Sequence, residues 1–351
     1  MKQTRKKAVV VCPGRGTYNK SELGYLHHFH SDKTDLIQSM DDYRLQSGQP
    51  AITGLDQADK FDPRIHTRGD NASSLIYACA YADFLSIDPD RIDVVAVTGN
   101  SMGWYIALTC ANSLNPDDAM SLIDTMGKLM HEQATGGQVI YPLLDENWKA
   151  IPGRALELDR LKQTINQQPD CVLSDSILLG GFRVFAGNEA ALELLNASLP
   201  SSGNYPMRLP NHAAFHSPLM QTISDTARSL IPPEPFKPPQ LPLVDGRAQS
   251  WFPLSSNARN LYQYTLGHQI VETYNFTRAI QVCVQEFAPD YLIIPGPGNS
   301  LGGATAQALI DIRWQGLKSK QDFLQRQQND PFILSMGLKE QRTLIVRRSH
   351  S

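Results

Sequence analysis

Long apolar runs and an excess of basic residues are both missing from this chain of 351 residues. No segment approaches the roughly 20 apolar residues that a membrane-spanning helix needs, and the apolar stretch after the basic start is too short for a signal peptide. The net charge is −3 at pH 7 and the pI is about 6.3, so general affinity for nucleic acid is not expected. These absences favour a cytoplasmic protein that binds neither nucleic acid nor a membrane.

Cysteine pairs and metal-ligand clusters are missing as well. The five cysteines are scattered and form no C-x-x-C pair, which fits buried thiols in a reducing compartment rather than a disulfide framework. His27, His28 and His30 lie close together, but no carboxylate or cysteine cluster accompanies them, so no metal site is expected. The glycine-rich segment 13–16 lacks the Lys-Ser/Thr of a phosphate-binding loop, which argues against nucleotide binding.

The residues that are present indicate an α/β fold. Hydrophobic residues make up 41% of the chain, enough for a sizeable core. Continuous apolar runs at 8–12 and 94–98 predict strands at 8–12 and 93–98, as in a mostly parallel sheet that is covered on both faces. A mainly helical segment is expected at 262–287, followed by the last core strand at 291–294.

A smaller unit is expected inside this fold. Between residues 136 and 209 the chain has a β-α-β-β-α-β order, the signature of a ferredoxin-like subdomain. We therefore expect residues 1–135 and 210–320 to form a discontinuous α/β core, with 136–209 inserted as a small subdomain. Residues 321–351 are expected to form a peripheral C-terminal helix and a tail, disordered at 347–351.

Ser101 is the first candidate for chemistry. It lies in Gly99-Asn100-Ser101-Met102-Gly103, between an apolar strand and an apolar, helix-like stretch. Small residues around a serine at a strand-to-helix turn are typical of a nucleophile elbow, in which the bent backbone lifts the hydroxyl out of the sheet. The unpaired N–H groups at the start of the helix then face any oxyanion formed there.

A serine hydroxyl needs a base to become a nucleophile. Of the nine histidines, His216 stands out, because it lies on a loop of small residues directly after the expected subdomain. A histidine in such a place can equally be structural, and the residues alone leave both interpretations open.

Several segments in order resemble one family. They are Pro-Gly-Arg-Gly-Thr at 13–17, the serine segment at 99–103, Phe-His-Ser-Pro-Leu-Met at 215–220 and Gly-Pro-Gly at 296–298, together with Gln269. The chain resembles the malonyl-CoA:acyl-carrier-protein transacylase family, the acyltransferases of fatty-acid and polyketide synthesis, from about residue 9 to residue 308. The histidine segment is the most specific of these motifs.

The resemblance implies a hydrolase-like α/β core with a ferredoxin-like lid and a Ser–His dyad. Ser101 would attack the thioester of an acyl-CoA, with His216 as general base oriented by the main-chain carbonyl of Gln269. The backbone N–H groups of Met102 and Arg15 would form the oxyanion hole. The family resemblance further implies an acyl carrier protein as partner and acyl-CoA as substrate, with no cofactor and no metal.

The acyl pocket departs from the family pattern. Malonyl-transferring members carry an arginine where this chain has Met126, and methionine cannot pair with a carboxylate. The family usually has glutamine at Arg15, so one hypothesis is that Arg15 supplies the cation instead; the other is that its side chain points to solvent. Asn100 also replaces the usual histidine before the serine. These changes leave the preferred acyl group open.

Three functions remain open at this point. The first is acyl transfer to a carrier protein, of a malonyl or related short acyl group. The second is hydrolysis, in which the same dyad releases acyl groups from carrier proteins as free acids. The third, a docking subunit without catalysis, is disfavoured because Ser101 and His216 are both present.

Overall fold

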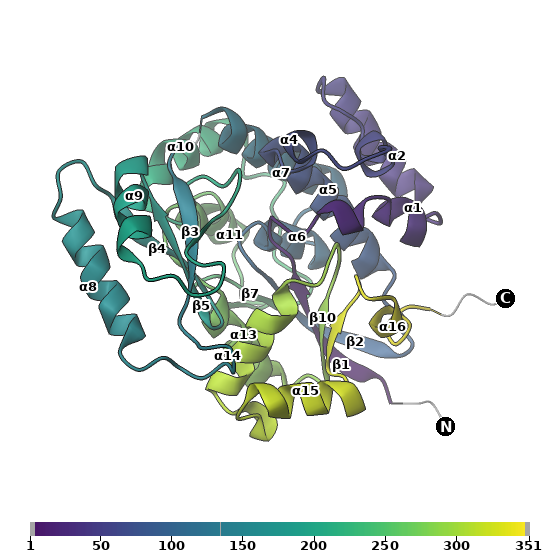
Figure 1. The fold of residues 1–351 in the computed structure, drawn as a ribbon. Coiled ribbons are helices and arrows are strands. Elements are labelled where there is room, and N and C mark those ends of the chain that lie inside the picture. Colours follow the sequence, from purple (N-terminus) through teal and green to yellow (C-terminus); the bar gives the residue numbers. More distant parts are fainter. Residues whose placement is uncertain (1–3, 134, 348–351) are drawn as a thin grey trace.

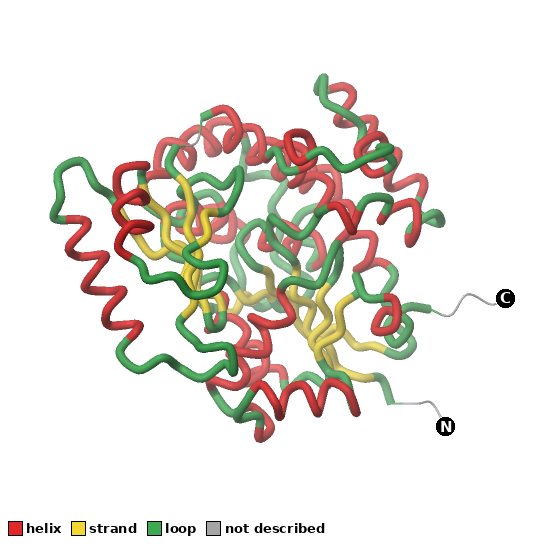
Figure 2. The backbone as a smooth tube through the Cα atoms, viewed as in Figure 1, coloured by secondary structure: helices red, strands yellow, loops and turns green. Residues whose placement is uncertain are grey.

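The computed structural model describes residues 4–133 and 135–347, so the disorder expected at 347–351 lies, apart from Arg347, outside the described residues. Figure 1 shows a larger unit built around one sheet and a smaller unit beside it, which contains β3, β4 and β5. Figure 2 shows the strands gathered into two separate groups, with helices around both.

The strands and helices are numbered separately, each in chain order. The strands are β1 Lys6–Cys12, β2 Ile92–Gly99, β3 Gly137–Pro142, β4 Leu173–Leu179, β5 Phe182–Gly187, β6 Met207–Arg208, β7 Leu243–Val244, β8 Ser250–Trp251, β9 Tyr274–Asn275, β10 Tyr291–Ile294 and β11 Ile333–Ser335. The first nine α-helices are α1 Tyr25–Phe29, α2 Thr34–Gln46, α3 Ile52–Asp56, α4 Pro63–His66, α5 Gly69–Leu85, α6 Gly103–Cys110, α7 Pro116–Glu132, α8 Arg154–Asn166 and α9 Glu189–Ser198. The others are α10 Gln221–Leu230, α11 Ala258–Thr265, α12 His268–Val271, α13 Phe276–Phe287, α14 Leu301–Asp311, α15 Lys320–Asn329 and α16 Lys339–Arg342, with 3-10 turns η1 Lys20–Glu22, η2 Pro218–Met220 and η3 Trp314–Gly316.

The larger sheet has the strand order β11-β10-β1-β2-β7-β8. All its pairs are parallel except β7 with β8. Residues 8–12 of β1 are fully buried, as a parallel strand covered on both faces requires. The expected α/β fold with a mostly parallel sheet is confirmed.

The smaller sheet has the order β6-β3-β5-β4-β9. Its first four strands alternate in direction and have the ferredoxin-like connectivity. This unit also has an apolar core of its own, centred on Val139, Tyr141, Phe185 and Leu192.

The segment 262–287 is mainly helical as predicted, in α11, α12 and α13, but the fifth strand of the smaller sheet, β9, interrupts it. Tyr274 and Asn275 pair in parallel with Ile177 and Leu178 at the edge of β4. The Asn275 side chain then accepts a hydrogen bond from the Arg278 N–H and begins α13. Tertiary hydrogen bonds to β4 therefore override the local helical pattern.

The C-terminal segment also differs from the expectation of a peripheral helix and tail. Residues 333–335 form β11, which pairs in parallel with β10, so β10 is not the last core strand. Only three buried residues carry this strand, too few for a recognisable period in the sequence.

A buried carboxylate ties this segment to the core. Asp83 on α5 is fully buried and accepts hydrogen bonds from Arg342 on α16, from Tyr25 Oη at 2.7 Å and from the Gly296 N–H at 2.6 Å. The His30 Nε2 also lies 2.8 Å from Asp83. Residues from three distant parts of the chain thus converge on the Asp83 carboxylate.

Replacing Arg342 with methionine is expected to lower the free energy of unfolding by about 3–5 kcal/mol, because the Asp83 charge loses its cation inside the core. Urea unfolding followed by circular dichroism measures this loss. Lys339→Met is the matched control, since Lys339 is exposed on the same helix. Equal losses in the two variants would show that the pair does not hold the C-terminal segment in place.

Candidate active site

Ser101 lies at the turn between β2 and α6, in the left-handed region with φ of 56°. Close backbone packing explains the two glycines around it. A Cβ on Gly103 would lie 2.2 Å from the Cys12 carbonyl oxygen, and one on Gly99 would lie 2.3 Å from the Gly103 carbonyl group. Since no side chain fits at either position, the turn has the sharp geometry of a nucleophile elbow.

The structure brings Ser101 and His216 together. The Ser101 Oγ lies 2.7 Å from the His216 Nε2, and the His216 Nδ1 lies 2.6 Å from the Gln269 carbonyl oxygen. Because a carbonyl only accepts, Nδ1 carries the proton and Nε2 is left to accept the hydroxyl proton. This is the arrangement that a serine and its general base require.

Burial keeps the His216 imidazole neutral. Desolvation is the largest effect and lowers the pKa of His216 to about 4, while the hydrogen bond to Gln269 opposes the shift. His216 also has a positive φ of 60°, and its backbone N–H donates to the Ile270 carbonyl at 2.8 Å. The ring is therefore held in place, unprotonated at neutral pH, with its lone pair toward Ser101.

The Gln269 side chain has a position that sequence reasoning missed. Its Nε2 donates to the Ser101 carbonyl at 3.0 Å, and its Oε1 accepts from the Tyr105 hydroxyl at 2.9 Å. The main chain of Gln269 holds the histidine while its side chain braces the turn that carries the serine. No sequence signal assigns this second contact, since it depends on α12 lying beside α6.

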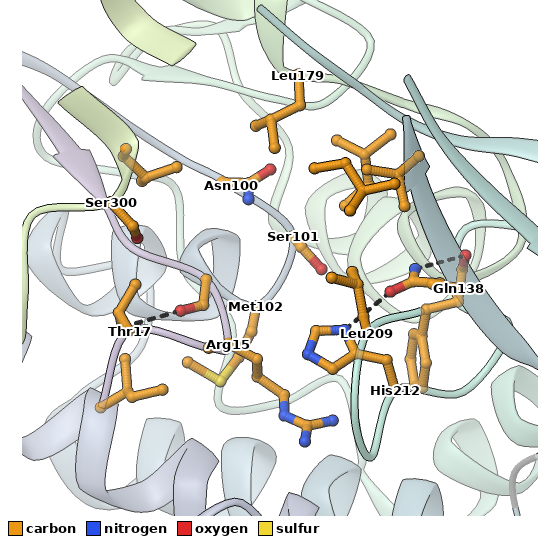
Figure 3. Close-up of a pocket in the computed structure, with 18 of the residues that line it drawn as sticks. Arg15, Thr17, Asn100, Ser101, Met102, Gln138, Leu179, Leu209, His212 and Ser300 are labelled. Carbon is orange, nitrogen blue, oxygen red and sulfur yellow. Dashed lines mark hydrogen bonds between the residues drawn. The ribbon is translucent and has the colours of Figure 1, made fainter. Parts of the chain in front are cut away.

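Two backbone N–H groups are available beside Ser101. Met102 stands at the N-terminus of α6, and Arg15 follows Gly14, where a Cβ would lie 2.6 Å from the Asn100 carbonyl oxygen. In the described part of the chain, neither the Met102 nor the Arg15 N–H donates to another acceptor. The two N–H groups expected for an oxyanion hole are therefore not engaged elsewhere, and Figure 3 shows Arg15 and Met102 near Ser101.

A cavity of about 590 Å³ opens in front of Ser101, between the core helices and the smaller sheet. Figure 3 shows Leu179, Asn100 and Ser300 on one side of it and Gln138 and Leu209 on the other. Its apolar lining includes Ile76, Ile123, Met126, Met130, Ile140, Ile177, Phe182 and Val184. Met126 on α7 lines the cavity and is buried. Asn100 lines it as well, and its Oδ1 has no hydrogen-bond partner in the described part of the chain.

The Arg15 side chain does not point to solvent. Its guanidinium lies against the Met130 sulfur and donates to the Thr67 carbonyl oxygen at 3.1 Å. Arg15 is one of the residues that line the cavity.

His212 is a second cavity histidine, which the sequence analysis did not identify. Its Nδ1 lies 2.9 Å from the Gln138 Oε1, and the Gln138 Nε2 donates to Ser176 Oγ at 2.7 Å. This orientation of the amide makes His212 Nδ1 the donor. Desolvation and the nearby Arg15 charge hold the pKa of His212 well below its usual value, so the ring is neutral.

Two negative findings complete the description. Within residues 4–133 and 135–347, no group of three or more His, Cys, Asp or Glu side chains is placed to hold a metal ion. No described helix combines the length and apolarity that crossing a membrane would require.

The fold and the site together define an α/β protein with an inserted ferredoxin-like sheet and a serine–histidine pair at a nucleophile elbow. No family model matches the chain. A phenolphthiocerol/phthiocerol polyketide synthase component of Mycobacterium tuberculosis is 23% identical over 305 residues, which are 86% of this chain. The chain spans only 19% of the length of that relative.

Two further matches are to transacylases. The malonyl CoA-acyl carrier protein transacylase of Haemophilus influenzae is 24% identical over 88% of this chain and 94% of its own length. A solved structure of a malonyl-transacylase in complex with its type II polyketide synthase acyl-carrier protein superposes with a TM-score of 0.69, at 20% identity, over 86% of this chain and 93% of that one. These matches confirm the resemblance to the malonyl-CoA:acyl-carrier-protein transacylase family.

The low pKa of His216 predicts how Ser101 reactivity depends on pH. A base with a pKa of about 4 stays neutral down to pH 5, so the rate of Ser101 modification by a fluorophosphonate should stay nearly constant from pH 8 to pH 5. An imidazole with its ordinary pKa of about 6.5 would lose about 30-fold over the same range. Intact-mass spectrometry measures the rate, with Ser101→Ala as the site control, and a midpoint near 6.5 would contradict the prediction.

Proposed function

We propose that this protein is an acyltransferase that moves a short acyl group from coenzyme A to the phosphopantetheine thiol of an acyl carrier protein, through an acyl-Ser101 intermediate. The observation that carries the proposal is the continuous hydrogen-bond chain from Ser101 Oγ through the imidazole of His216 to the Gln269 carbonyl, at 2.7 and 2.6 Å. The named activity of the transacylase relatives supports the choice of donor and acceptor.

The first half-reaction forms the acyl-serine. Ser101 Oγ attacks the thioester carbonyl while its proton passes to His216 Nε2. The carbon–sulfur bond then breaks, and the imidazolium returns the proton to the departing coenzyme A thiolate. The Gln269 carbonyl stabilises the imidazolium that exists between these two steps.

The second half-reaction reverses these steps with a new thiol. The carrier thiol gives its proton to His216 and attacks the acyl carbonyl, the carbon–oxygen bond to Ser101 breaks, and the proton goes to Ser101 Oγ. In both halves the Met102 and Arg15 N–H groups donate to the oxyanion, and each such donor is typically worth about 3 kcal/mol of barrier.

This route requires neither a metal nor a cofactor, because acyl-CoA is a substrate and the serine and histidine supply the nucleophile and the base. The macromolecular partner that we propose is the carrier protein. Its support is the solved complex between a protein of this fold and its acyl-carrier protein.

Brief exposure to an acyl-CoA should add one acyl group to the intact protein, measurable by mass spectrometry. The Ser101→Ala variant should add none, and His216→Ala should acylate about 10³-fold more slowly because it lacks the base. Addition of a holo carrier protein should then transfer the acyl group to its thiol. Free acid formed equally fast with and without carrier would instead indicate the hydrolase.

A further inference from the structure

Arg15 is the one permanently charged side chain among the described residues that line the cavity of Ser101. Its lining contains no aspartate or glutamate. The lining also contains a histidine, His212. This ring is neutral, because burial and the Arg15 charge lower its pKa. The one formal charge on the lining of this mostly apolar space is therefore positive, which favours an anionic ligand.

The guanidinium of Arg15 has no carboxylate partner in the described part of the chain. It contacts a thioether and a main-chain carbonyl, which are dipoles rather than charges, and its buried Nε has no acceptor. Asp70, the carboxylate whose charge acts on Arg15, pairs with Arg68 at 2.8 Å. Arg15 is only partly buried, but its Nε is buried, and a cation without an anion in such a place is costly. A ligand carboxylate would compensate it.

Arg15 stays charged in this setting. Desolvation lowers its pKa to about 10, and the attraction of Asp70 partly offsets the shift. At pH 7 the guanidinium is therefore protonated, with an N–H still to donate. The neighbouring Met130 sulfur is a weak acceptor, so a carboxylate would replace that contact with a charge-assisted hydrogen bond.

On the basis of the proposed function, we infer that Arg15 binds the carboxylate of a dicarboxylic acyl thioester. Arg15 would then supply the positive charge that Met126 on α7 cannot supply. Arg15 also offers its backbone N–H to the thioester oxyanion. One residue would thus contact both ends of the acyl group, which restricts the site to short diacids and links acid recognition to the alignment of the carbonyl.

Malonyl-CoA and isovaleryl-CoA test this inference, because their acyl groups have the same heavy-atom skeleton and differ in the carboxylate. The measured quantity is the ratio of their second-order rate constants for Ser101 acylation. Loop shifts in a variant affect both substrates, so the ratio isolates the charge. Wild type should prefer malonyl-CoA, and Arg15→Met should lower the ratio roughly 100-fold. Arg15→Lys, which keeps the charge, should lower it less.

A double variant tests whether the effect of Arg15→Met comes from the lost charge or from unfolding. Arg15→Met combined with Met126→Arg returns a cation to the cavity from α7 and should restore part of the preference for malonyl-CoA; thermal melts show whether each variant is folded. A ratio unchanged in Arg15→Met, or a wild type that prefers isovaleryl-CoA, would overturn the inference and leave the proposed transfer intact. Absence of acyl-Ser101 with every thioester would refute the proposed function itself.

Discussion

The hydrogen bond between His216 Nδ1 and the Gln269 carbonyl is the contact on which the site depends. It fixes the tautomer, so that the lone pair of Nε2 faces Ser101. A carbonyl carries no full charge, and therefore it raises the histidine pKa less than a carboxylate would. The result is a base that remains neutral in a buried position, oriented by the short helix α12.

The smaller sheet helps to position His216 by binding the backbone of the residue before it. Ser176 on β4 donates to the Phe215 carbonyl at 2.8 Å, and Gln138 on β3 donates to Ser176 at 2.7 Å. His216 follows Phe215 directly, so the backbone that carries the base is pinned to the inserted unit. Core and subdomain therefore build one site rather than a site and a separate lid.

Sequence reasoning recovered the parts of this arrangement that local patterns encode. The strand, the small-residue turn and the helix around Ser101 are consecutive, so their chemistry is readable from one segment. The location of the Arg15 side chain, the second role of Gln269 and the presence of His212 depend on residues far apart in the chain. The short strands β9 and β11 were missed because two or three residues show no period, and their pairing is decided by the neighbouring strand edges.

The strand β9 has a mechanical consequence for the cavity. The inserted unit joins the core through its two chain ends and also through β9, where Thr273 and Thr277 hydrogen-bond to the Asp175 and Leu178 carbonyls at 2.8 and 3.1 Å. The third attachment opposes a rotation of the inserted unit about its two chain connections. The wall of the acyl cavity is thus attached to the core at three places, and such preorganisation lowers the ordering entropy lost when a ligand enters.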